Sequence, residues 1–81
     1  MTLWFENRHG TRRQICDCQT WTEVSKSIDE FIAQANAAKL ASNPNSTPFK
    51  RCYTRVWKED GMTKIDVGSH TEFFYWEGEY E

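Results

Sequence analysis

The sequence predicts an α+β domain in which an antiparallel sheet of four to five strands carries one amphipathic helix on one face, in the order ββαβββ. Three observations lead to this fold class. The first 18 residues have the pattern of two short strands around a glycine-bearing loop. Apolar residues in 20–42 recur with a helical period. Residues 50–77 contain segments in which side chains of different character alternate, as in strands, and turn residues separate these segments. A chain of 81 residues has room for one core, so we expect a single domain over residues 1–81.

The first two strands are predicted to form a hairpin. Residues 2–6 are rich in aromatic side chains, and residues 7–11 are polar and contain Gly10, which is typical of a hairpin loop. A second strand over residues 12–18 should therefore return antiparallel to the first.

The helix is predicted to begin at Thr20. Thr20 and Glu23 fit a capping box, in which the threonine hydroxyl accepts from the Glu23 amide and the glutamate accepts from the Thr20 amide. Apolar side chains then recur at three- and four-residue spacing and form one stripe, at Trp21, Val24, Ile28, Phe31, Ile32, Ala35 and Ala38. The helix should end near residues 40–42, because residues 43–48 contain both prolines of the chain.

Three further strands are predicted over residues 50–57, 62–67 and 71–77. Asp60 and Gly61 supply a tight turn between the first two, because this pair readily takes positive backbone angles. Alternation in residues 50–57 directs the small side chains of Cys52, Thr54 and Val56 toward the helix, and those of Arg51, Tyr53, Arg55 and Trp57 to the other face.

Aromatic side chains exceed what one helix can cover. Alternation in residues 71–77 sends Phe73 and Tyr75 to one face and Phe74 and Trp76 to the other, so both faces of this strand are apolar. We expect the uncovered face to present some of a set of aromatic and arginine side chains: Trp4, Tyr53, Arg55, Trp57, Phe74 and Trp76. Burying one large apolar side chain contributes roughly 1.5 to 3 kcal/mol, so a bare cluster favours association with a second molecule.

The charge distribution argues against two classes of partner, and the cysteine content indicates the redox environment. The net charge is −2, with an excess of bases in residues 50–64 and acids without Lys or Arg in residues 65–81, so neither nucleic acid nor an anionic membrane is an expected partner. The three cysteines are too few and too unevenly spaced for a disulfide scaffold. Because the N-terminal residues also lack a basic segment followed by an apolar one, we expect reduced thiols and a cytoplasmic location.

No metal site or cofactor is expected. The best candidate combines Cys16, Cys18 and Cys52 with His9 or His70, since thiolate and imidazole are the ligands of tetrahedral zinc. Zinc knuckles space paired cysteines by two to four residues on a turn, whereas Cys16 and Cys18 are separated by one residue in a predicted strand. Ordinary buried thiols are the better interpretation.

Catalysis is likewise not expected, and we assign no catalytic residue. Ser69, His70 and Glu72 suggest a hydrolase, but adjacent residues in an extended chain point apart, so Ser69 and His70 should not meet. A small-ligand or nucleotide-binding protein or a minimal hydrolase, centred on His70 with Arg55 and Glu72, stays open as the alternative.

Residues 55–61, RVWKEDG, and residues 64–74, KIDVGSHTEFF, carry a resemblance. They resemble segments of small accessory proteins encoded by phages and prophages of Gram-positive bacteria. The resemblance implies an inhibitor or adaptor that binds a host protein in the cytoplasm of a bacterial host, and it implies no catalytic residues.

The leading hypothesis is a non-enzymatic protein-interaction module, homodimeric and able to bind a host protein. Interface cores favour Tyr, Trp, Phe and Arg, and the candidate binding residues on the aromatic and acidic surface are Tyr53, Arg55, Trp57, Asp66, His70, Glu72, Phe74 and Trp76. A narrower version is an acidic inhibitor that mimics nucleic acid through a cluster of carboxylates: Asp66, Glu72, Glu77, Glu79 and Glu81.

Overall fold

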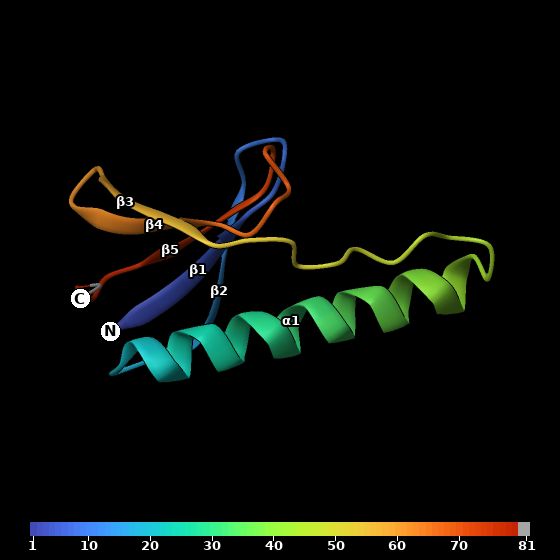
Figure 1. Ribbon diagram of the computed structural model, residues 1–81, viewed down its shortest axis with the longest axis horizontal. Helices are drawn as coiled ribbons and strands as arrows, with labels where there is room; N and C mark the ends of the chain where they lie inside the picture. The colour runs from blue at the N-terminus through green and yellow to red at the C-terminus, as the bar shows by residue number, and fades with distance from the viewer. Residues whose placement is uncertain (80–81) are drawn as a thin grey trace.

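The computed structural model describes residues 1–79, which contain one helix and a five-stranded sheet (Figure 1). In chain order the elements are β1 (Thr2–Glu6), β2 (Arg12–Asp17), α1 (Trp21–Ser42), β3 (Arg55–Glu59), β4 (Met62–Asp66) and β5 (Phe73–Trp76). All strand pairs are antiparallel. The α+β class and the order ββαβββ predicted from the sequence are confirmed.

The sheet has the order β2-β1-β5-β4-β3, which joins the first strand of the chain to the last. Leu3 lies opposite Trp76 and Phe5 opposite Phe74. Strands β2 and β3 form the two edges, and the β1–β2 pairing contains an irregularity between Leu3 and Trp4. Side chains on one face of β1 and β5 therefore meet across the middle of the sheet.

Helix α1 begins with the predicted capping box. The Thr20 hydroxyl accepts from the Glu23 amide at 3.2 Å, and the Glu23 carboxylate accepts from the Thr20 amide at 3.1 Å. At the other end the Asn43 amide donates to the Lys39 carbonyl, and Pro44 follows. Local hydrogen bonding thus sets both ends of the helix near the predicted positions.

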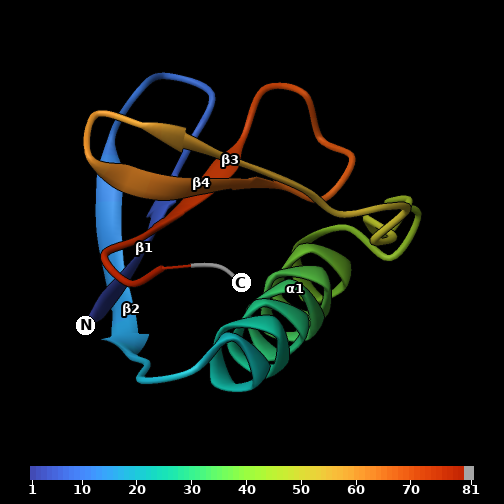
Figure 2. The same ribbon diagram turned by 60° about the vertical axis from the view of Figure 1, so that its left-hand side comes forward.

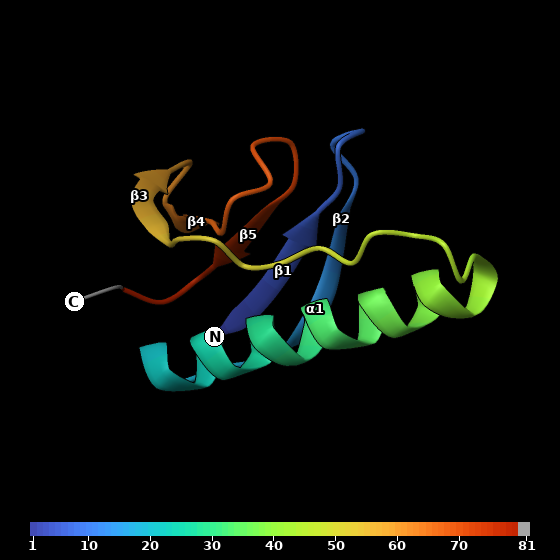
Figure 3. The same cartoon turned by 45° about the vertical axis from the view of Figure 1, so that its right-hand side comes forward.

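The core lies between α1 and the face of the sheet that the helix covers. Its buried apolar side chains are Leu3, Cys18, Val24, Ile28, Ile65, Val67, Phe74 and Trp76. Phe31 of α1 packs with its ring centroid 4.6 Å from Phe5 and 5.6 Å from Phe74. Ala35 and Ala38, which continue the predicted stripe, are exposed, because the C-terminal half of α1 extends past the sheet (Figure 3).

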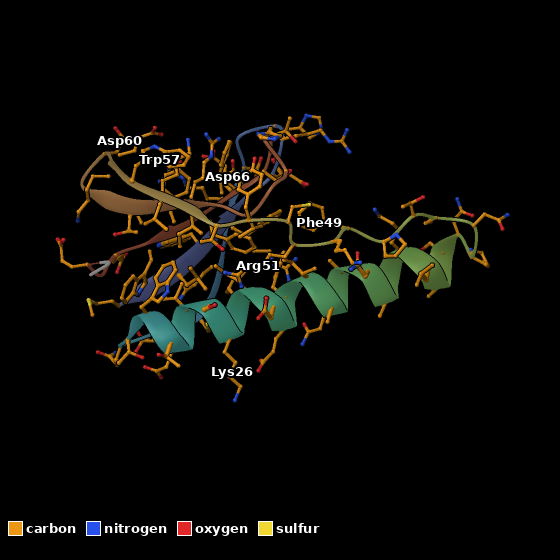
Figure 4. The ribbon with its side chains drawn as sticks, in the orientation of Figure 1. Lys26, Phe49, Arg51, Trp57, Asp60 and Asp66 are labelled. Atoms are coloured by element: carbon orange, nitrogen blue, oxygen red, sulfur yellow. The ribbon has the colours of Figure 1, made fainter. Side chains whose placement is uncertain are left out.

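The segment 43–54 returns along α1 before the sheet resumes (Figure 1). The Asn36 side chain makes two hydrogen bonds of 2.8 Å with the backbone of Phe49, and Arg51 pairs with Asp29 at 2.8 Å. Arg51 therefore points toward α1, as Figure 4 shows, and not to the opposite face as predicted. The predicted strand over residues 50–57 begins only at Arg55, because these contacts direct the preceding residues to the helix.

The sheet face opposite α1 is not the bare aromatic surface expected from the sequence. Phe74 and Trp76 are only 3% and 2% exposed, because the register with β1 turns them into the core. On the open face Tyr75 is also only 2% exposed. Some residues of a set of six that includes Phe74 and Trp76 were expected on the uncovered face, and these two do not lie there, because they belong to the core.

Two basic side chains, Arg12 and Lys64, shield the rings of the open face, and we call them the cationic cover. The Arg12 guanidinium lies 4.0 Å from the centroid of the Tyr75 ring. The Lys64 ammonium lies 4.2 Å from the centroid of Phe73 and 5.3 Å from that of Tyr75. Long basic side chains thus replace a second layer, with their charged groups directly over the rings.

Candidate functional site

Five of the predicted binding residues gather on the open face of β3 and β4 and the adjoining loops. This group, which we call the β3 patch, comprises Tyr53, Arg55, Trp57, Asp66 and His70. The β3–β4 hairpin positions it: Asp60 and Gly61 take φ values of 54° and 75°, which suit a primed turn. Figure 4 shows Trp57 and Asp66 on the side of the hairpin away from α1.

Asp66 is the buried anchor of the β3 patch. Its side chain is 0% exposed, and it accepts hydrogen bonds from Arg55 Nη2 at 2.9 Å and from the Gly68 amide at 3.0 Å. Burial by itself raises the pKa of Asp66, but the hydrogen bonds from Gly68, Arg55 and the His70 backbone outweigh it and hold the pKa below its usual value. The carboxylate therefore stays charged and fixes the Arg55 guanidinium over the sheet.

His70 and Tyr53 form the loop side of the patch. The Tyr53 hydroxyl lies 2.9 Å from His70 Nε2, and His70 Nδ1 lies 3.7 Å from Asp66 Oδ2. His70 has a φ of 65°, a left-handed conformation that is uncommon outside glycine and that turns its ring back over Tyr53. The cluster holds Tyr53 in place although 39% of this residue is exposed.

Trp57 is the most prominent apolar residue of the patch. It is 36% exposed, and its ring lies between Arg55, at 5.8 Å, and the Lys64 ammonium, at 5.7 Å. One edge packs against Phe73 in a T-shaped contact. The indole is therefore oriented by its neighbours on one side and open to solvent on the other.

The remaining predicted site residues lie elsewhere. Glu72 turns to Ser69, whose hydroxyl accepts from the Glu72 amide at 3.2 Å. Both residues line a separate hollow of about 170 Å³, with Phe31 and Phe49 among its apolar walls, and neither Arg55 nor His70 lines it. The structure thus separates Glu72 from His70.

The geometry does not assemble the components of a hydrolase. The Ser69 hydroxyl contacts Thr71 and Glu72, whereas both ring nitrogens of His70 face the Tyr53 hydroxyl. The two side chains point apart in a turn in which His70 has a φ of 65°, and not in the extended chain that was assumed from the sequence.

The three cysteines do not come together, because only Cys16 and Cys18 are neighbours. Cys16 and Cys18 lie with their sulfur atoms 3.5 Å apart beside Ser27, while the Cys52 thiol donates to the Lys50 carbonyl. Burial raises the pKa of the Cys18 thiol. Within residues 1–79, no three His, Cys, Asp or Glu side chains come together in a way that could hold a metal ion.

The predicted acidic cluster is dispersed. Asp66 pairs with Arg55, Glu79 pairs with Lys58 at 2.7 Å, and Glu77 accepts from the Thr2 amide. Glu81 lies outside the described residues. Asp66, Glu77 and Glu79 thus interact with different parts of the chain, and within residues 1–79 they do not form one acidic surface.

Sequence reasoning missed the residues that lie beside the β3 patch on the open face and contact Trp57. Lys64 pairs with Glu59 at 2.9 Å, and Glu59 also accepts from the Tyr75 hydroxyl at 3.2 Å. Burial by itself lowers the pKa of Lys64, but its contacts with Tyr75 and Glu59 outweigh burial, so its pKa lies above the usual value. Opposite charges on both sides of the Asp60–Gly61 turn are the signal from which this pair could have been found.

Comparison with known proteins finds no matching family model, no matching curated protein and no matching solved structure. In the described part of the chain, the helix is not apolar enough over a sufficient length to cross a membrane.

Proposed function

We propose that the protein is a non-enzymatic protein-interaction module that binds its partner through the β3 patch and the open edge of β3. The observation that supports this proposal is the exposure of Trp57 and Tyr53 beside Arg55 along a strand that pairs on one side only. Trp, Tyr and Arg are the residue types that contribute most to the energy of protein interfaces.

The patch is suited to binding because its side chains are already ordered. Arg55 is held by Asp66, and Tyr53 is held by His70, so less side-chain entropy is lost when a partner docks. An edge strand adds unpaired backbone groups, which accept an extended segment of another chain as a further strand. Backbone pairing would provide affinity, and Trp57 and Arg55 would provide specificity.

A host protein is the class of partner that the resemblance to phage accessory proteins implies. The dispersed carboxylates do not support a mimic of nucleic acid, so the proposal rests on the aromatic and arginine side chains alone.

The test is capture of partners from the native host with wild-type protein and two variants, followed by mass spectrometry. We expect Trp57→Ala to lose the captured protein, whereas Leu40→Ala retains it. Leu40 is a matched control, because it is 39% exposed and lies on α1 away from the patch. Equal capture by wild type and Trp57→Ala would remove the β3 patch as the binding surface.

A second proposal, a small-ligand or nucleotide site at His70, is favoured by the chain of contacts from Tyr53 through His70 to Asp66. A thermal-shift screen against nucleotides and divalent metal ions tests it. A shift with wild type that His70→Ala abolishes would support this site, and no shift with any compound would reject it.

A further inference from the structure

We propose that β3 pairs with β3 of a second copy of this chain, antiparallel and with the twofold axis at Trp57, so that two sheets join into one. The inference rests on the proposed function, since it assigns an occupant to the same edge. It adds the identity of the partner, the direction of the strands and the register.

The backbone of β3 restricts the possible registers. Glu59 and Met62 flank a two-residue turn, and in such hairpins the flanking pair is hydrogen-bonded. Alternation then directs the N–H and C=O groups of residues 55, 57 and 59 toward β4, and those of Val56 and Lys58 to the open side. A second β3 strand must therefore place outward-facing, even-numbered residues of its own opposite these positions, with the twofold axis within residues 56–58 so that most of the strand pairs.

Three symmetric registers satisfy that condition, and charge distinguishes them. With Trp57 on the axis, Arg55 lies opposite Glu59 of the second copy, twice by symmetry, and the two indoles meet at the centre. A register centred on Lys58 brings two ammonium groups together, which is unfavourable. One centred on Val56 leaves Glu59 without a strand residue opposite it, so the register centred on Trp57 is the most complementary.

Arg55 and Glu59 can accommodate these additional contacts. Arg55 uses Nη2 for Asp66, and Glu59 uses Oε2 for Lys64 and Tyr75. Oε1 of Glu59 has only a long contact of 3.4 Å with the Trp57 indole. These contacts leave other nitrogen atoms of Arg55 and Oε1 of Glu59 for ion pairs with a second strand at the edge.

The helix-side surface of β3 has space for the second copy. Val56, Trp57, Lys58 and Thr63 line a hollow of about 110 Å³. In Figure 2, β3 runs along the upper margin of the sheet with α1 below it. In the proposed register Val56 and Lys58 of the second copy alternate with Lys58 and Val56 at this margin, where their aliphatic parts can fill the hollow.

The opposite edge is less suited to self-pairing. Strand β2 is paired to β1 across an irregularity between Leu3 and Trp4, which disturbs the regular alternation of its outward groups. It also carries adjacent arginines, Arg12 and Arg13, in its first two positions. Natural proteins use both features to keep edge strands from pairing.

Sedimentation from micromolar to millimolar concentration tests the dimer with a pair of matched variants. Lys58→Pro removes an outward N–H that no intrachain pair needs, so the fold should persist while dimerisation weakens about thirtyfold or more, because symmetry removes two inter-chain hydrogen bonds. Lys58→Ala loses the same contact with Glu79 but keeps the N–H, and it should dimerise like wild type. A monomeric wild type, or a Lys58→Pro variant that is folded and equally dimeric, would overturn the proposal.

Disulfide trapping tests the register in a Cys52→Ser background, because Cys52 is exposed. Val56→Cys and Lys58→Cys both keep Trp57, and in the proposed register their thiols lie opposite each other across the interface. Oxidation of a mixture of the two variants should therefore link position 56 to position 58 about tenfold faster than it links either variant to itself. A faster link of Val56→Cys to itself would indicate the register centred on Val56, a faster link of Lys58→Cys to itself the register centred on Lys58, and either result would overturn the proposed register.

The outcomes separate this inference from the proposed function. A chain that stays monomeric but captures another protein in a Trp57-dependent manner leaves the proposed function standing and removes self-pairing. A chain that neither dimerises nor captures another protein would reject both self-pairing and the proposed function.

Discussion

On the face of the sheet beneath α1, Trp76 is buried by the helix and by apolar neighbours, whereas on the opposite face Tyr75 is equally buried beneath Arg12 and Lys64. Both rings are 2% exposed, but the first environment is apolar and the second is ionic at its outer boundary. A small domain can thus cover a second aromatic face with long basic side chains, without another helix. Counting helices against aromatic faces overestimates the bare surface.

The comparison changes where association is expected. Most of the open face is already shielded within one copy, so exposed apolar surface across the whole face is not an argument for a partner. Among residues 1–79, the exposed Phe, Trp and Tyr side chains are those of Tyr53 and Trp57, in β3 and the segment just before it.

The largest effect is expected on the helix-covered face. Phe74→Ala leaves a cavity between β5, Phe5 and Phe31, and should lower the free energy of unfolding by about 4 kcal/mol. Urea unfolding followed by tryptophan fluorescence measures this loss. Leu40→Ala on the exposed end of α1 is the control and should change stability by no more than about 0.5 kcal/mol.

A smaller loss is expected when the cationic cover is opened. Lys64→Ala exposes Phe73 and Tyr75 to water and should lower the free energy of unfolding by about 2 kcal/mol. Lys64→Met retains an apolar cover but no charge, so it should restore part of the loss. Urea unfolding of the two variants separates covering from charge, and identical stabilities would show that Lys64 acts by its charge alone.

Asp66 should make stability depend on pH at the acidic end. Its pKa is lower in the folded chain than the ordinary 3.8, so its contribution is present above that pH and is lost as pH falls through the folded-state pKa. Asp66→Asn should lose about 1.5 kcal/mol at neutral pH, and its difference from wild type should shrink below pH 3.8. Thermal unfolding over a pH series tests this, and a constant difference would contradict it.

The smallest effect is expected at Arg12. Its guanidinium stacks on Tyr75 and pairs with Glu6 at an exposed edge, so Arg12→Ala should lower the free energy of unfolding by about 0.5 kcal/mol. Urea unfolding at low and high salt checks it. A loss as large as that for Lys64→Ala would mean that the two members of the cationic cover contribute equally.

Sequence reasoning was reliable where a few neighbouring residues decide the structure. The capping box of Thr20 and Glu23 placed the start of α1, and the Asp60–Gly61 pair placed the β3–β4 turn. Alternation also correctly placed Arg55 on the face away from the helix, where it pairs with Asp66 at 2.9 Å. The β3 patch could be anticipated because it comes from two consecutive strands and the adjoining loops.

Sequence reasoning failed where distant segments decide. Phe74 and Trp76 belonged to the set of which some residues were expected on the open face, but β5 lies in the middle of the sheet beside β1, with both side chains in the core under α1. Arg51 was expected in a strand, but Asp29 on α1 attracts it. The local pattern identifies neither β1 as the neighbour of β5 nor Asp29 as the partner of Arg51.

The chain's local chemistry alone specifies its helix, its turns and the alternation of its strands, because capping, backbone angles and side-chain periodicity act over a few residues. Only the folded molecule decides which face of the sheet the helix covers, which rings the basic side chains shield and which strands remain at the edges. Those features depend on contacts between residues far apart in the chain, such as Arg12 with Tyr75, and these form only when the strands are in register.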